Sequence, residues 1–159
     1  MHYYSALTDA TINAVFALAC DTLHPLANPT EAERVAVVAV GGYGRAEMAP
    51  YSDIDLLFLT PWKMTAWAES IIESMLYILW DLKLRVGHAS RTVKDCLRLG
   101  REDYTIRTAL LERRFLAGYQ PLAAELRAKL RDQLFRNTGA EFIEAKLTER
   151  AERHKRQGG

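Results

Sequence analysis

The segment from Val35 to Thr60, VAVVAVGGYGRAEMAPYSDIDLLFLT, constrains the fold more than any other part of the chain. It begins with a β-branched apolar run, reaches a Gly-Gly pair at Gly41, and ends in a second apolar run that carries Asp53 and Asp55. Short runs rich in Val and Ile and bounded by Gly or Pro are typical of strands. The first run is almost continuously apolar, which predicts a strand covered on both faces. We therefore expect two strands joined by a glycine-led insert.

Asp53 and Asp55 are the residues of this segment that indicate chemistry. Side chains alternate along a strand, so both carboxylates share the face of Leu57, about 7 Å apart along the chain. Like charges that close repel one another and raise a pKa unless a positive group lies between them. Mg²⁺ prefers such carboxylate oxygens as ligands. The pair therefore predicts a metal site, the alternative being a turn cap at Asp53 and a solvent-facing Asp55.

The context of the two aspartates favours the metal site. Asp is disfavoured inside strands, yet this strand is otherwise among the most apolar stretches of the chain. Gly41 and Gly42 precede it, and glycine allows backbone N–H groups to approach a phosphate closely. Carboxylates for a metal beside glycines for phosphate indicate a site that handles nucleotides.

Two further polar residues of the insert are candidates for phosphate binding. The forked donors of Arg45 match phosphate oxygens, although an ion pair with Glu47 or with a carboxylate of the site would use the same group. Ser52 can donate to a phosphate oxygen or satisfy the turn before Asp53. The residues alone leave these alternatives open.

The order strand, Gly-Gly, insert and Asp-x-Asp resembles the signature of the DNA polymerase beta-like nucleotidyltransferase superfamily. The strings GGYGRAEMAPYSDIDLLFL, LWDLKLRVGHASRT and TALLERRFLAG resemble a narrower family. They are similar to the N-terminal catalytic domain of the protein-PII uridylyltransferase/uridylyl-removing enzymes. The resemblance covers Val35 to Gly118 strongly and the helical remainder weakly.

This resemblance implies a reaction. The domain would transfer UMP from UTP to a tyrosine hydroxyl of the PII protein of nitrogen regulation, releasing pyrophosphate. Asp53 and Asp55 would hold Mg²⁺, with Mn²⁺ as the alternative ion, and Gly41 and Gly42 would cradle the phosphates. Another nucleoside triphosphate and acceptor, or a non-catalytic nucleotide-binding module, are the alternatives.

The later part of the chain departs from the superfamily pattern. A third carboxylate commonly lies on a later strand, but no Asp or Glu occurs between Lys83 and Lys94. Glu112 and Asp81 are substitutes without a strand context. His88, in the family-like VGH segment, is an accessory candidate for contacting nucleotide or acceptor, or a structural hydrogen-bonding residue.

Periodicity predicts a mixed α/β fold, a short mixed sheet flanked by helices with a helical C-terminal extension. The expected helices are 5–23, starting at Ser5 or Thr8, then 66–82, 94–100, 103–116 with Gly118 as C-cap, one that begins near Pro121, and 141–155; a third strand is expected at 84–93. The first helix would bury Leu7, Ala14, Val15, Leu18 and Ala19. We expect an N-terminal helical segment at 1–34, a nucleotidyltransferase core at 35–118 and a helical extension at 119–159, truncated from a longer protein.

Composition excludes few classes of protein. The net charge of the 159 residues is +1, so no overall field indicates a nucleic-acid partner. No uninterrupted apolar run approaches the length of a membrane span, and no signal peptide is expected. Cys20 and Cys96 lack metal-ligand spacing and are expected to be buried thiols of a cytoplasmic protein. The histidines are scattered, so no uridylyl-removing hydrolase centre is expected within the chain.

Overall fold

The computed structural model describes residues 2–44 and 54–135. Four strands form one sheet in the order β3-β2-β1-β4, with β1 at Ala36–Ala39, β2 at Ile54–Thr60, β3 at Val86–Thr92 and β4 at Arg114–Gly118. Strand β1 pairs antiparallel with β2 and with β4, whereas β2 and β3 are parallel. This mixed sheet confirms the predicted fold class.

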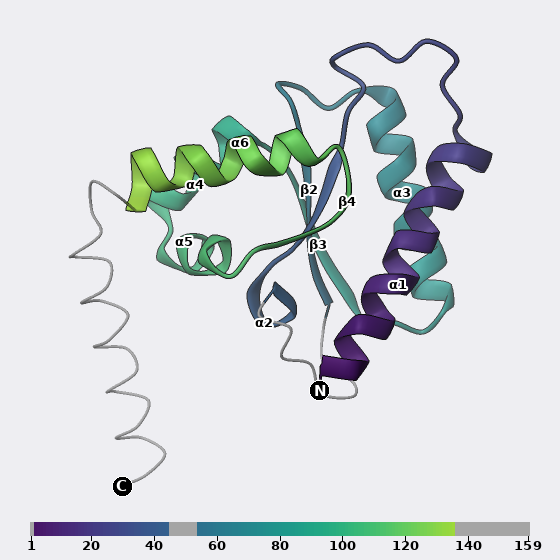
Figure 1. The fold of residues 1–159 in the computed structure, drawn as a ribbon, viewed down its shortest axis with the longest axis horizontal. Helices are drawn as coiled ribbons and strands as arrows, with labels where there is room; N and C mark the ends of the chain where they lie inside the picture. The colour runs from purple at the N-terminus through teal and green to yellow at the C-terminus, as the bar shows by residue number, and fades with distance from the viewer. Residues whose placement is uncertain (1, 45–53, 136–159) are drawn as a thin grey trace, which may run out of the picture.

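Helices cover both faces of the sheet (Figure 1). They are α1 at His2–Leu18, α2 at Gly41–Gly44, α3 at Ala66–Asp81, α4 at Val93–Glu102, α5 at Tyr104–Leu111 and α6 at Gln120–Leu130. Two π-helical turns extend α1 and α6, at Ala19–Leu23 and Arg131–Phe135. Helices α1 and α3 lie on one face, and α4, α5 and α6 lie on the other.

The side-chain alternation predicted for β2 is confirmed. Ile54, Leu56 and Phe58 belong to the core cluster under α1 and α3. Leu57 and Leu59 belong to the cluster under α4 and α6. All four residues of β1 are buried, as expected for a central strand covered on both faces.

Capping residues and a proline mark the first turns of several helices. The side chain of Thr65 accepts a hydrogen bond of 3.1 Å from the Ala68 N–H and caps α3. Thr92 and Asp95 form a capping box at the start of α4. In α6, Pro121 lies in the first turn as predicted. The leucines expected along one side of this helix and of the π-helical turn that extends it are buried: Leu122, Leu126, Leu130 and Leu134.

The prediction of a helix from Asp103 to Leu116 with Gly118 as its C-cap is wrong. The helix ends at Leu111, and Arg114–Gly118 is strand β4, which pairs with the open edge of β1. An edge strand leaves a row of unpaired N–H and C=O groups. Pairing with β1 satisfies these groups and decides the structure of RFLAG, which is too short for periodicity to assign.

The first helix also differs from expectation in detail. It begins at His2 rather than at Ser5 or Thr8, and Leu7 and Leu18 are 57% and 42% exposed. Of the predicted stripe, Val15 and Ala19 enter the core and Ala14 is exposed, whereas Ile12, which is not part of that stripe, is also buried. The predicted helix at 141–155 lies outside the described residues.

Residues Ala6–Leu23 form a helical stretch with a mean hydropathy of 1.2, sufficient by length and composition for a membrane span. Asp9 and Asp21 interrupt it, so the expectation of no uninterrupted apolar run of that length holds. The stretch packs its buried side chains against the sheet and α3. Because 22% of the stretch is buried, contact with the core accounts for part of its apolar composition.

Candidate functional site

Asp55 is the exposed member of an otherwise buried strand. Its carbonyl oxygen accepts a hydrogen bond of 3.1 Å from the Val40 N–H, and the preceding Ile54 N–H donates to Arg85 O at 2.8 Å. These bonds hold the start of β2 between β1 and β3. The Asp55 side chain shares the face of Leu57, as the alternation predicts.

Two glycines flank the Asp55 carboxylate. Gly41 has a φ of +63°, in the left-handed region that glycine adopts most readily, and a Cβ built on it would lie 3.5 Å from Asp55 Oδ2. Gly87 is the direct partner of Asp55 across the β2–β3 pair, and a Cβ there would lie 2.8 Å from Oδ1. Glycine at both positions therefore leaves room on two sides of the carboxylate.

Gly87 is a residue of the site that the sequence analysis missed. Within the VGH segment, the sequence indicates His88 as the candidate and gives no chemical signal at Gly87. Because β2 and β3 are parallel and in register, Gly87 lies beside Asp55, whereas His88 lies beside Leu56 on the opposite face. The sequence does not show which residue of β3 pairs with Asp55, and this pairing decides that Gly87 rather than His88 lies beside it.

Helix α2 packs tightly against the chain that leads into β4. Its Gly44 N–H donates to Val40 O at 3.2 Å. A Cβ on Gly44 would overlap the carbonyl oxygen of Glu112, so the backbone of Glu112 is in direct contact with the glycine segment. Glu112, one candidate for a third carboxylate, is thus near α2 through its main chain.

A polar network fixes α2 between α1 and β4. The Tyr43 hydroxyl donates a hydrogen bond to Asp9, and the Arg114 guanidinium forms an ion pair with the same carboxylate. Arg114 also donates to Tyr43 O at 2.9 Å, with its guanidinium carbon 5.1 Å from the centre of the Tyr43 ring. Burial, followed by the interaction with Asp9, raises the pKa of Tyr43 well above its ordinary value. Three elements distant in sequence thereby hold the glycine turn that precedes Asp55.

Not all predicted site residues come together. Gly41 lies beside Asp55, and Gly42 belongs to the same short helix. His88 is on the other face, where it lines a cavity with α3 and lies 6.4 Å from the Trp80 ring. Arg45, Ser52 and Asp53 lie outside the described residues.

The Asp55 carboxylate suits a hard divalent cation, because it belongs to an exposed residue and lies between two glycines that carry no side chain. Within residues 2–44 and 54–135, no three His, Cys, Asp or Glu side chains form a metal-binding group. Asp53 is the predicted second carboxylate for such an ion, and that ligand remains a prediction.

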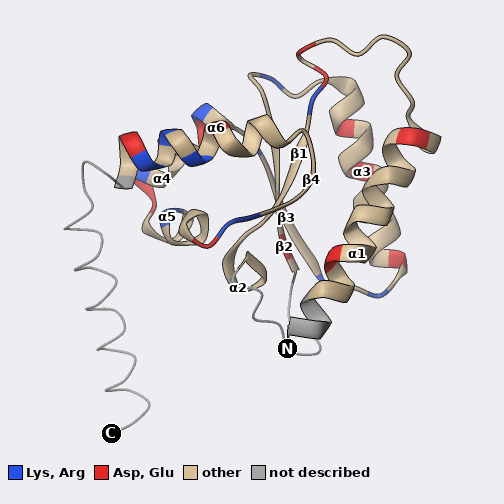
Figure 2. Ribbon diagram, in the orientation of Figure 1, with Lys and Arg blue, Asp and Glu red and all other residues tan. Residues whose placement is uncertain are grey.

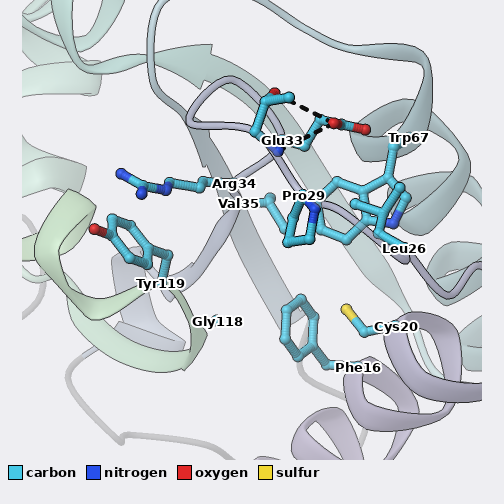
Figure 3. A pocket seen from close by; sticks show the side chains of 11 residues that line it. Phe16, Cys20, Leu26, Pro29, Glu33, Arg34, Val35, Trp67, Gly118 and Tyr119 are labelled. Carbon is cyan, nitrogen blue, oxygen red and sulfur yellow. Dashed lines mark hydrogen bonds between the residues drawn. The ribbon is translucent and has the colours of Figure 1, made fainter.

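A cavity lies at the end of the sheet opposite Asp55, and Figure 3 shows the side chains that line it. This cavity of about 560 Å³ is lined by Phe16, Cys20, Trp67 and Tyr119, and Arg34 stacks on Tyr119 at 4.2 Å. Burial raises the pKa of the Cys20 thiol to about 11, so the sulfur is neutral at physiological pH. Val35 and Gly118 border this cavity, whereas Asp55 lies beyond the other end of β1.

Comparison with known proteins identifies relatives over nearly the whole chain. Residues 1–79 match the family described as glutamate-ammonia ligase adenylyltransferase. A bifunctional uridylyltransferase/uridylyl-removing enzyme of Cereibacter sphaeroides is 76% identical over 98% of this chain and 17% of its own length. The proteins of the same name from Ruegeria pomeroyi and Phenylobacterium zucineum are 65% and 55% identical, over 98% and 97% of the chain and 17% and 16% of their lengths. The chain spans about one sixth of each of these relatives.

Proposed function

Because the chain belongs, as a segment, to the family of bifunctional uridylyltransferase/uridylyl-removing enzymes, we propose that it carries their nucleotidyl-transfer chemistry. The observation that carries this proposal is the exposed Asp55 carboxylate between Gly41 and Gly87. The specific reaction would be transfer of UMP from UTP to a tyrosine hydroxyl of the PII protein, in the cytoplasm, with release of pyrophosphate.

The residues of the site would divide the work. Asp53 and Asp55 would hold a divalent cation, Mg²⁺ or Mn²⁺, which when bound supplies Lewis-acid stabilisation of the charge on the phosphates. The backbone of Gly41 and Gly42 would lie against the phosphates because no side chain blocks its approach. Arg45 and Ser52 would donate to phosphate oxygens.

The network of Asp9, Tyr43 and Arg114 would contribute by positioning. It ties the helix of the glycine turn to α1 and β4, so the turn is held in place before a nucleotide arrives. Binding groups that are held in position cost less free energy to order when the ligand binds. Such pre-organisation would support phosphate alignment without a contact from any of these three side chains to substrate.

Adenylyl transfer is the second candidate, and one observation favours it. Half of the chain matches a family described as an adenylyltransferase, so ATP could replace UTP. The two reactions share the metal and phosphate chemistry and differ in the base and the acceptor.

The test is metal-dependent pyrophosphate release with each nucleoside triphosphate, with and without PII protein. We expect release with UTP and PII, and a loss of about 10³-fold in Asp55→Asn, as removal of several kcal/mol of charge stabilisation would give. The variant should remain folded by circular dichroism, since Asp55 is exposed. Full activity in Asp55→Asn would reject the site, and activity with ATP alone would select the second candidate.

A further inference from the structure

A cavity of about 380 Å³ lies between the start of β4 and α6, and it is lined by residues other than those of the candidate site around Asp55. Arg113, Gln120 and Arg127 supply its polar lining, and Val38 and Phe115 are among its apolar walls. Figure 2 shows basic residues where the chain enters β4 and along α6. The cavity thus combines two cationic side chains with an amide and apolar walls.

The two arginines place like charges at one cavity, and none of the described residues that line it is an Asp or Glu. In the described part of the chain, no Asp or Glu forms an ion pair with Arg113 or Arg127. The nearest acid of α6 in sequence, Glu125, is engaged by Lys129 at 2.9 Å. Arg113 is half-buried and donates to Leu110 O at 3.0 Å, which fixes its guanidinium at the cavity. Burial first, and then the charge of Arg127, lower the pKa of Arg113.

An anion would offset this repulsion, and the charge of the pair selects its class. Guanidinium groups bind oxyanions through paired hydrogen bonds. The two guanidinium groups together carry a charge of +2. A phosphate dianion neutralises this charge fully, whereas a single carboxylate neutralises half of it. We propose that Arg113 and Arg127 form a binding site for a phosphate-bearing ligand, with Gln120 as a further hydrogen-bonding group.

The proposed phosphate site lies near Asp55 in the fold but is separate from it. Val40 is bonded to Asp55 on one side of β1, and on the other side Arg113 directly precedes Arg114, the β4 partner of Ala39. The two backbones are therefore separated by two strand spacings, about 10 Å. Arg114 in turn holds Tyr43 of α2. The inference does not depend on nucleotidyl transfer, because it concerns binding of phosphate alone.

The experiment is calorimetric titration of the 159-residue chain with inorganic phosphate at constant ionic strength, with EDTA present. EDTA removes metal ions, and without a metal the negative charge of Asp55 repels phosphate. The heat of phosphate binding is therefore expected to come from the arginine site. Arg127→Gln is the primary variant because Arg127 is exposed and its loss should leave the fold intact. We expect phosphate affinity to fall about tenfold or more, the effect of losing a charge-assisted hydrogen bond. Arg127→Lys keeps the positive charge and loses the paired donors of the guanidinium. Its phosphate affinity should lie between those of the unaltered chain and Arg127→Gln.

Lys129→Gln is the matched control, since it removes the same charge from the same helix two residues away. It should bind phosphate as the unaltered chain does. Absence of phosphate binding to the unaltered chain, equal losses in Arg127→Gln and Lys129→Gln, or loss of binding in Asp55→Asn would each overturn the proposal. Equally tight binding of acetate would overturn the phosphate class. Ribose 5-phosphate binding more tightly than inorganic phosphate would support an organic ligand against Val38 and Phe115, and equal binding would support free phosphate.

Discussion

Glycines near the two ends of β1 and in α2 serve two opposite purposes. Gly41 and Gly87 leave space beside the Asp55 carboxylate, where the neighbouring atom is the end of a side chain. Gly44 and Gly118 instead allow two backbones to touch, Gly44 against Glu112 O and Gly118 against Val35 O. The first pair keeps a site accessible, and the second pair closes the fold. A methyl group should therefore cost activity at one pair and stability at the other.

The largest effect on this comparison is expected from Gly44→Ala. The added Cβ would overlap a carbonyl oxygen that cannot rotate away, so the contact between α2 and the start of β4 must open. We expect the free energy of unfolding to fall by about 3 kcal/mol, the upper part of the range for overpacking. Urea unfolding followed by circular dichroism measures it.

Gly100→Ala is the control for Gly44→Ala. A Cβ on Gly100 meets the side-chain ends of Leu134 and Leu110 at 3.0 and 3.4 Å, which can shift, and alanine is favoured inside α4. Its stability should change by less than about 1 kcal/mol. Similar losses for both variants would contradict the distinction between backbone and side-chain neighbours.

Gly87→Ala should have a smaller effect than Gly44→Ala, and the effect should be on activity rather than on stability. Its Cβ would lie 2.8 Å from Asp55 Oδ1, and the carboxylate can rotate to relieve the contact. Stability should change by less than about 1 kcal/mol, while pyrophosphate release falls about tenfold because the metal-binding carboxylate is turned. Steady-state kinetics beside urea unfolding separates the two effects.

Ala89→Gly provides the comparison in the same strand and on the same face. It alters β3 two residues from Gly87, away from Asp55, and should leave turnover unchanged apart from the fraction folded. An equal loss of turnover in Ala89→Gly would show that β3 tolerates no change, rather than that Gly87 opens the site.

The smallest effect is expected from Tyr43→Phe, which removes the hydroxyl bonded to Asp9. Loss of one hydrogen bond should lower stability by about 1 kcal/mol near neutral pH. The pKa of Tyr43 is raised in the folded chain, chiefly by burial, while the unfolded phenol ionises at about pH 10. The unfolded state therefore loses its proton first, and the contribution of Tyr43 to stability falls as pH rises above about 10. Tyr43→Phe should lose less stability over that range, as urea unfolding at alkaline pH would measure.

Tyr77→Phe serves as the control, because Tyr77 is 58% exposed on α3. It should show the stability and the alkaline loss of the unaltered chain. If Tyr43→Phe loses stability above pH 10 as steeply as the unaltered chain, the hydroxyl of Tyr43 does not contribute to this pH dependence.

The sequence predicted the parts of the candidate site that lie within a single segment of the chain. The alternation in β2 predicted the face of Asp55, and the Gly-Gly pair predicted the start of the insert that α2 opens. Gly87 was missed because its place beside Asp55 depends on the register of two strands separated by a helix. His88 was considered in its place because a histidine carries a chemical signal of its own and a glycine does not.

The sequence by itself determined the features that arise between near neighbours: strands β1 and β2, the buried stripe of α6, and the exposed aspartate on an apolar strand. Only the tertiary structure decided that RFLAG is a strand. A strand needs hydrogen bonds from a neighbouring strand, and the folded chain supplies them from β1. It also decided the pairing of Asp9 with Arg114, 105 residues apart. The physical reason is that periodicity and propensity report on the next few residues, whereas strand pairing and ion pairs depend on which distant segments the folded core brings together.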